Sequence, residues 1–231
     1  MNQNSILKRI NLIKQAINTT LIEAQRKPNT VKLLCVSKYA SLEQMREAIA
    51  AGEHCFAENY LQTALVKIEA LQSYHLEWHF IGQIQRNKTR KIAENFAWVH
   101  SVDSAQIARR LSAQRASDHP LNVCIQVNID TDISKGGVMP DDVKNLATII
   151  DQLPQLNLRG LMTVLKKHDK LEDNRQSYYR LRKLFLQLQE NGFNLDTLSM
   201  GMSADFTTAI IEGATMVRLG SAIFNPKSAN S

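Results

Sequence analysis

Short apolar segments alternate with amphipathic segments along almost the whole chain. The apolar segments are rich in branched side chains, which is typical of buried strands. They lie at 31–37, 54–57, 77–82, 97–101, 121–129, 157–163, 196–200 and 215–219. Between them, apolar residues recur at helical spacing over 41–51, 58–71, 86–95, 103–116, 139–152, 171–191 and 204–211, with a short helix near 221–225. The pattern predicts eight strands, each followed by a helix.

An additional helix is predicted ahead of the first strand, over 4–26, where isoleucines recur three and four positions apart. Eight strand–helix pairs indicate the α/β class and a (β/α)8 TIM barrel, here with an extra N-terminal helix. A doubly wound open sheet is the alternative, because periodicity does not show whether a sheet closes. No segment has the composition of a linker, and 166–173 resembles a surface loop. Residues 1–231 are therefore predicted to form a single domain.

Composition narrows the class of protein. With 44% hydrophobic and 22% charged residues, the chain has the make-up of an ordinary globular domain. It contains no apolar run long enough to span a membrane, and its N-terminal segment is amphipathic, unlike a signal peptide. Cys35, Cys55 and Cys124 lie far apart in strand-like runs, without metal-ligand spacing. We expect reduced core thiols, no metal, no membrane partner and a cytoplasmic location.

The net charge of +6 raises the question of nucleic-acid binding. The basic residues are scattered, however, and their one dense cluster comprises Arg86, Lys88, Arg90 and Lys91. A solvated helix face explains this cluster more simply, so no nucleic-acid partner is predicted. The alternative, a basic interaction module, predicts salt-sensitive binding to RNA or DNA.

Lys38 stands at the end of an apolar strand-like run. Because strand side chains alternate, Lys38 shares a face with Leu34 and Val36. Burial disfavours the charged form of an amine, and a neutral lysine amine forms Schiff bases with aldehydes. The alternative is that Lys38 only ends the strand, with its ammonium group reaching water.

Several predicted strands end in polar residues, and in a barrel all these ends lie at the face where active sites form. They are Lys38, Glu58, Asn59, Gly82, Gln83, Asn128, Ser203 and Arg218. The segments 199–205 and 217–222 each pass through a glycine and a serine before a predicted helix, which suits a phosphate. An aldehyde-reactive amine facing a phosphate site indicates pyridoxal 5'-phosphate (PLP).

Motifs spread from about residue 31 to 226 carry a family resemblance. They are Val36-Ser37-Lys38, Phe56-Ala57-Glu58-Asn59-Tyr60, the run 78–88 from Trp78 to Lys88, Gln126-Val127-Asn128, Ser134-Lys135-Gly136-Gly137, Arg159-Gly160-Leu161-Met162, the run 199–203 and the run 216–220. In this ordered set the chain resembles the pyridoxal phosphate homeostasis protein family, which shares the barrel of the alanine racemase N-terminal domain.

The resemblance implies roles for individual residues. Lys38 would form the internal aldimine with PLP, and Ser203, Gly220 and Ser221 would hold the phosphate. Arg218 would face the pyridine nitrogen. The remaining cofactor-binding residues implied by the resemblance are Asn59, His79 and Met162. The chain departs from the family pattern at Ala57, where glycine is usual, and at Ser221, where threonine is common. A third departure is the segment 163–165, which replaces a more usual alanine-isoleucine-proline stretch and is expected to alter access to the pocket or contacts with partners.

The resemblance and the chemistry favour a carrier over an enzyme. An arginine opposite the pyridine nitrogen keeps the ring unprotonated and weakens it as an electron sink. Racemases of this fold also draw a second base from a further domain, for which the chain has no apparent room. We expect a non-catalytic protein for intracellular PLP homeostasis that influences amino- and keto-acid balance. PLP-dependent apo-enzymes are candidate recipients, and a monomer is expected. A small PLP-dependent amino-acid racemase is the alternative.

Overall fold

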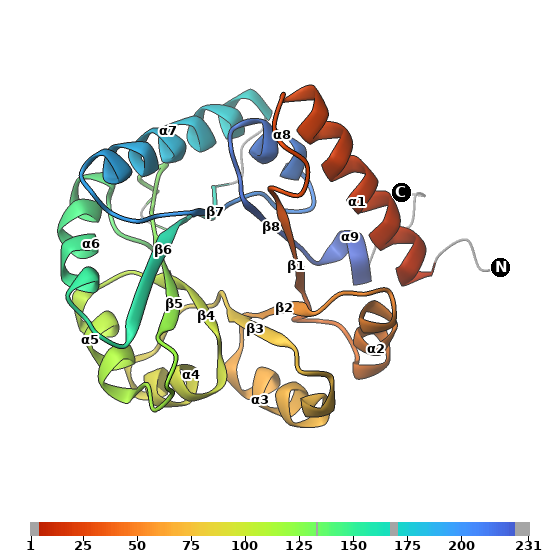
Figure 1. Ribbon diagram of the computed structural model, residues 1–231, viewed down its shortest axis with the longest axis horizontal. Helices are drawn as coiled ribbons and strands as arrows, with labels where there is room; N and C mark the ends of the chain where they lie inside the picture. The colour runs from red at the N-terminus through yellow and green to blue at the C-terminus, as the bar shows by residue number, and fades with distance from the viewer. Residues whose placement is uncertain (1–4, 133, 167–170, 225–231) are drawn as a thin grey trace.

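The barrel is closed. The computed structural model describes residues 5–132, 134–166 and 171–224, and its parallel strands pair in chain order until β8 pairs with β1 (Figure 1). The strands are β1 (Lys32–Val36), β2 (Cys55–Glu58), β3 (Glu77–Phe80), β4 (Trp98–Val102), β5 (Leu121–Gln126), β6 (Leu156–Met162), β7 (Thr197–Ser199) and β8 (Met216–Leu219). The predicted (β/α)8 barrel is confirmed, and the open-sheet alternative is wrong.

Helices form the outer layer around this ring of strands, as Figure 1 shows. They are α1 (Ile6–Glu23), α2 (Leu42–Ala50), α3 (Leu61–Ala70), α4 (Thr89–Asn95), α5 (Ala105–Gln114), α6 (Val143–Asp151), α7 (Leu171–Glu190), α8 (Phe206–Ile211) and α9 (Ser221–Phe224). Short 3₁₀ turns lie at Gln72–Tyr74, Arg86–Lys88 and Pro140–Asp142. Among the helices described, none is long and apolar enough to cross a membrane.

The extra N-terminal helix is α1, which packs against α2, α8 and α9 outside β1 and β8 (Figure 1). Ser5 caps it by accepting a hydrogen bond from the Lys8 amide, so the helix begins near the predicted boundary. It ends at Glu23, three residues before the predicted end at 26. There Arg26 instead donates to the carbonyl oxygens of Ile210 and Ala214, at 2.7 and 2.9 Å. This contact fixes the turn after α1 on the barrel.

Strand alternation divides the apolar residues between two layers. Leu33 and Cys35 of β1 face the large core between the strands and helices. Leu34 and Val36 face the barrel interior, where they pack with residues such as Met216. The alternation predicted for this strand is therefore confirmed. Because Lys38 follows in the same register, the chain carries it toward the carboxyl-end mouth of the barrel.

Several predicted boundaries were too generous at the carboxyl ends of strands. β3 ends at Phe80 and β5 at Gln126, whereas the sequence predicted 82 and 129. After β5, Asn128 accepts from the Asp132 amide at 3.1 Å and donates to the Asp132 carbonyl at 2.8 Å. The chain thus leaves the sheet in a loop that this side chain closes. Of the predicted loop 166–173, residues 167–170 lie outside the described part of the chain.

Candidate functional site

A cavity of about 550 Å³ opens at the carboxyl ends of the strands. It lies where the ends of β1, β2, β3 and β8 meet the loops after β6 and β7. Its lining comprises Val36, Lys38, Tyr39, Ala40, Asn59, Ile81, Val164, Met202, Ser203, Ala204, Arg218, Gly220, Ser221 and Phe224. Six of the eight predicted cofactor-binding residues are therefore brought together: Lys38, Asn59, Ser203, Arg218, Gly220 and Ser221.

Lys38 lies in the turn after β1 and is half-buried. Its ammonium nitrogen is 4.9 Å from the centre of the Tyr39 ring. Ser37, the residue before Lys38, contacts a buried ion pair. Lys67 Nζ donates to the Ser37 carbonyl at 2.6 Å and to Glu58 Oε1 at 2.7 Å. The Ser37 hydroxyl also donates to Glu58 Oε1, at 2.7 Å. Glu58 therefore faces the α3 side and anchors the Lys38 turn, without lining the cavity.

Two turns after β7 and β8 meet at the cavity. The Ser203 hydroxyl accepts a hydrogen bond from the Ala222 amide at 3.3 Å, so the first turn directly contacts the start of α9. Asp205 holds that turn by accepting from the Met202 amide and the Tyr178 hydroxyl, both at 2.8 Å. At Gly220 a Cβ atom would lie 3.0 Å from the Val36 carbonyl oxygen. The glycine thus permits β8 to pass close to β1.

Arg218 and Asn59 provide the buried polar groups of the cavity. Arg218 is 4% exposed, and burial lowers the pKa of its guanidinium. It donates from Nη1 to the Ser199 hydroxyl at 2.9 Å and from Nη2 to the Thr163 carbonyl at 2.7 Å. Asn59 Oδ1 is buried and has no hydrogen-bond partner among the described residues. Such an orphaned atom costs about 1–3 kcal/mol unless a ligand or water pairs with it.

His79 and Met162 do not line this cavity. His79 is fully buried in the barrel interior and stacks on Trp98, with ring centres 5.4 Å apart. Met162 packs in the interior with Trp98 and Cys124. Their assignment as cofactor-binding residues therefore stays a prediction that the lining of the cavity does not support. Gln83 is exposed and lies outside the lining.

The altered segment 163–165 does reach the site, since Val164 lines the cavity. A second departure, Ala57, is fully buried in the interior cluster beneath the cavity. The third, Ser221, lies at the first position of α9 and lines the cavity directly. All three departures from the family pattern are thus at or next to the cavity.

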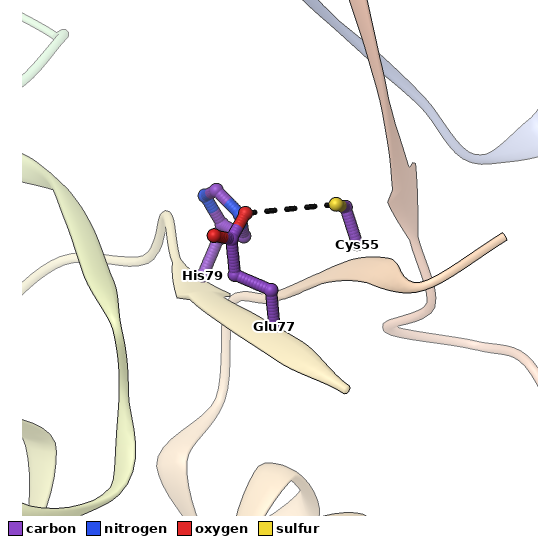
Figure 2. A group of neighbouring side chains, drawn as sticks. All are labelled: Cys55, Glu77 and His79. Atoms are coloured by element: carbon purple, nitrogen blue, oxygen red, sulfur yellow. Dashed lines mark hydrogen bonds and ion pairs between the residues drawn. The ribbon is translucent and has the colours of Figure 1, made fainter. Parts of the chain in front are cut away.

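Sequence spacing missed a polar cluster at the opposite, amino end of the barrel. Cys55, Glu77 and His79 place their ligand-type atoms within 4.8 Å of one another (Figure 2). Cys55 pairs directly with Glu77 across β2 and β3, and His79 follows Glu77 on the same face. Strand alternation places Glu77 and His79 on one face, but the pairing with Cys55 depends on the register between strands.

The chain is similar to known proteins over nearly its whole length. The family described as "Alanine racemase, N-terminal domain" matches residues 10–227. The pyridoxal phosphate homeostasis protein of Pseudomonas aeruginosa is 49% identical over 225 residues, covering 97% of this chain and 96% of that protein. Its counterpart in Haemophilus influenzae is 44% identical over 229 residues, covering 97% of both.

A solved structure is also similar to this chain in both sequence and fold. PipY of Synechococcus elongatus PCC7942, with PLP bound, shares 34% sequence identity and superposes with a TM-score of 0.79. The match covers 90% of this chain and 99% of PipY. The resemblance noted from the motifs is thus confirmed along nearly the whole chain. The chain belongs to the pyridoxal phosphate homeostasis protein family, built on the barrel of the alanine racemase N-terminal domain.

Proposed function

We propose that this protein binds PLP reversibly in the carboxyl-end cavity and serves as a cofactor carrier, not as an enzyme. One observation carries the proposal: a single cavity is lined by a lysine amine, by the two serine-bearing turns after β7 and β8, and by a buried guanidinium. Its volume of about 550 Å³ falls in the usual range for small-molecule sites. The PLP-bound relative and the relatives named for PLP homeostasis support the same reading.

The residues present fit the chemical groups of PLP. The Lys38 amine can condense with the aldehyde, forming a C=N bond and releasing water. The hydroxyls of Ser203 and Ser221, with the backbone amides of the turn at Gly220, suit the phosphate oxygens. The unpartnered Asn59 Oδ1 offers a further polar contact inside the cavity. Together these groups account for covalent attachment, phosphate binding and orientation of the ring.

The absence of catalysis is proposed on the chemistry of Arg218. A guanidinium has only N–H donors, so it can hydrogen-bond a ring nitrogen only when that nitrogen is unprotonated. PLP enzymes that form carbanions usually place a carboxylate there, because a protonated ring withdraws electrons more strongly. A ring held by Arg218 is a poor electron sink, which suits storage and delivery. We propose PLP-dependent apo-enzymes as recipients, with an effect on amino- and keto-acid balance.

The binding proposal is tested by the visible spectrum of the purified protein, followed by borohydride reduction and peptide mapping. We expect a Schiff-base absorption band and pyridoxyl mass on the peptide containing Lys38. Lys38→Ala should lose both, whereas Lys183→Ala, a change at an exposed position of α7, should keep them. Pyridoxyl label on a different lysine of the native protein would contradict the assignment.

The carrier proposal is tested by incubating the PLP-loaded protein with single enantiomers of alanine, serine and glutamate. We expect each enantiomer to persist except for the slow background reaction of free PLP. Turnover on the order of 1 per second or faster, typical of enzymes, would favour the racemase alternative.

A further inference from the structure

A continuous chain of hydrogen bonds crosses the barrel interior from the amino-end cluster to the cavity. Glu77 Oε1 lies 2.8 Å from His79 Nε2, and His79 Nδ1 lies 2.9 Å from His100 Nε2. His100 Nδ1 lies 2.8 Å from the Ser199 hydroxyl, which accepts from Arg218 at 2.9 Å. His79, His100 and Ser199 are fully buried. The proposed binding function uses only the Arg218 end.

The residues at the two ends of this hydrogen-bond chain, Arg218 and Glu77, constrain where the protons between them lie. Arg218 can only donate, so Ser199 accepts from it. Glu77 is paired with the Lys32 ammonium at 2.6 Å, and its hydrogen bond to His79 lowers its pKa, so it is ionised and can only accept. His79 Nε2 must therefore carry a hydrogen.

Neutral histidines then leave one arrangement. With its hydrogen on Nε2, a neutral His79 accepts at Nδ1 from His100 Nε2–H. His100 in turn accepts at Nδ1 from the Ser199 hydroxyl. Every donor in the chain thus points from Arg218 toward Glu77.

Burial supports the neutral form of both rings. Burial is the largest cause that lowers the pKa of His79, and it lowers the pKa of His100 well below the ordinary histidine value. The charges facing them are Lys32 and Arg218, which disfavour a further positive charge, and Glu77, which favours one. A protonated His79 would reverse the chain and add a buried charge. Desolvation weighs against that state.

The amino-end cluster itself is not proposed as a metal site, although Cys55, Glu77 and His79 are ligand types. The same Glu77 oxygen already accepts from Lys32 at 2.6 Å and pairs with His79 at 2.8 Å. Cys55 Sγ lies 3.5 Å from it (Figure 2). A metal ion would have to displace the ammonium group and the His79 hydrogen bond together. The cluster is better explained as the acceptor end of the chain.

We propose that His79 and His100 are positioning residues that hold the Arg218 guanidinium in one orientation through this one-way chain anchored at Glu77. Neither histidine needs to touch the ligand. With Nη1 and Nη2 fixed by Ser199 and Thr163, the guanidinium presents its remaining donors to the cavity in a set direction. It therefore selects a ligand with an acceptor atom there. Resting on the proposed PLP function, this makes the unprotonated ring nitrogen the atom that Arg218 recognises.

The first test is ¹⁵N NMR of histidine-labelled protein without added cofactor, so it stands even if PLP binding fails. His79 and His100 should both show a protonated Nε2 and an unprotonated Nδ1. Glu77→Leu removes the acceptor and should admit the reversed tautomers. Lys32→Met, the matched control at the same carboxylate, should leave both tautomers unchanged. A native protein with Nδ1–H on either ring, or a Glu77→Leu variant with unaltered tautomers, would refute the proposed one-way hydrogen-bond chain.

The second test compares PLP with an analogue whose ring nitrogen is replaced by a C–H group. In the native protein the analogue should bind about 2- to 10-fold more weakly, the equivalent of one hydrogen bond. Glu77→Leu should shrink that ratio although Glu77 does not line the cavity, and Lys32→Met should preserve it. A Glu77→Leu ratio equal to the native one refutes the positioning role. Failure of the native protein to bind PLP at all would refute the proposed function instead.

Discussion

Replacement of Lys67 by methionine should destabilise the whole barrel, because it leaves a buried carboxylate without its counter-charge. Glu58 is fully buried, and the Lys67 side chain is only 8% exposed. Removing one partner of such a pair typically costs about 3–5 kcal/mol. The Ser37 carbonyl loses its 2.6 Å donor as well, next to the turn that bears Lys38. For a chain of this length the cost corresponds to a melting temperature lowered by roughly 6–20 °C.

Urea denaturation of the PLP-free protein measures this loss, and a double mutant isolates its cause. Glu58→Gln combined with Lys67→Met removes both charges and should recover at least about 1–2 kcal/mol. Asp196→Asn, which removes the negative charge of a partly exposed pair with Arg159, is the control and should cost less than about 1 kcal/mol. If Lys67→Met cost no more than that control, the pair would contribute no more than a surface ion pair.

Gly82→Ala should lower the free energy of unfolding, measured by urea denaturation, by about 1–3 kcal/mol and should weaken PLP binding. The reason is that the added Cβ would lie 1.9 Å from the Asn59 carbonyl oxygen. The control Gly136→Ala, whose Cβ would have no neighbouring atom nearer than 3.4 Å, should lower the free energy of unfolding less. Folding lowers the pKa values of His79 and His100 below the ordinary histidine pKa of 6.5. At a pH below about 6.5 the unfolded protein therefore binds more protons than the folded protein does. The unfolding free energy should therefore fall as pH drops below about 6.5, and less steeply in His100→Gln, as measured by urea titrations across that range.

Much of the fold could be predicted from the sequence because each strand and helix carries its own periodicity. In β1 the alternation of Leu33 and Leu34 between two apolar layers follows from a period of two alone. Barrel closure could not be predicted in this way, because it rests on the pairing of β8 with β1. Strand ends were also misplaced, since apolar residues such as Val127 and Ile129 continue into a buried loop.

The cavity residues were predictable to the extent that they stand at strand ends. Lys38, Asn59 and Arg218 reach one mouth because all parallel strands end there. His79 and His100 gave no such signal. Their contact depends on the register of β3 against β4 and on their distance from the Ser199 hydroxyl, which only the closed barrel defines.

The burial of Arg218 accounts for a polar barrel interior that stability alone does not require. Withdrawing a guanidinium from water costs several kcal/mol unless hydrogen bonds and opposite charge compensate. Ser199 supplies one acceptor, and the Asp205 charge, itself held by Tyr178 and the Met202 amide, acts on Arg218 from nearby. An apolar interior of similar volume would be about as stable. What it would lack is a donor fixed toward the cavity by rigid strands, and this requirement explains why polar groups occupy the interior.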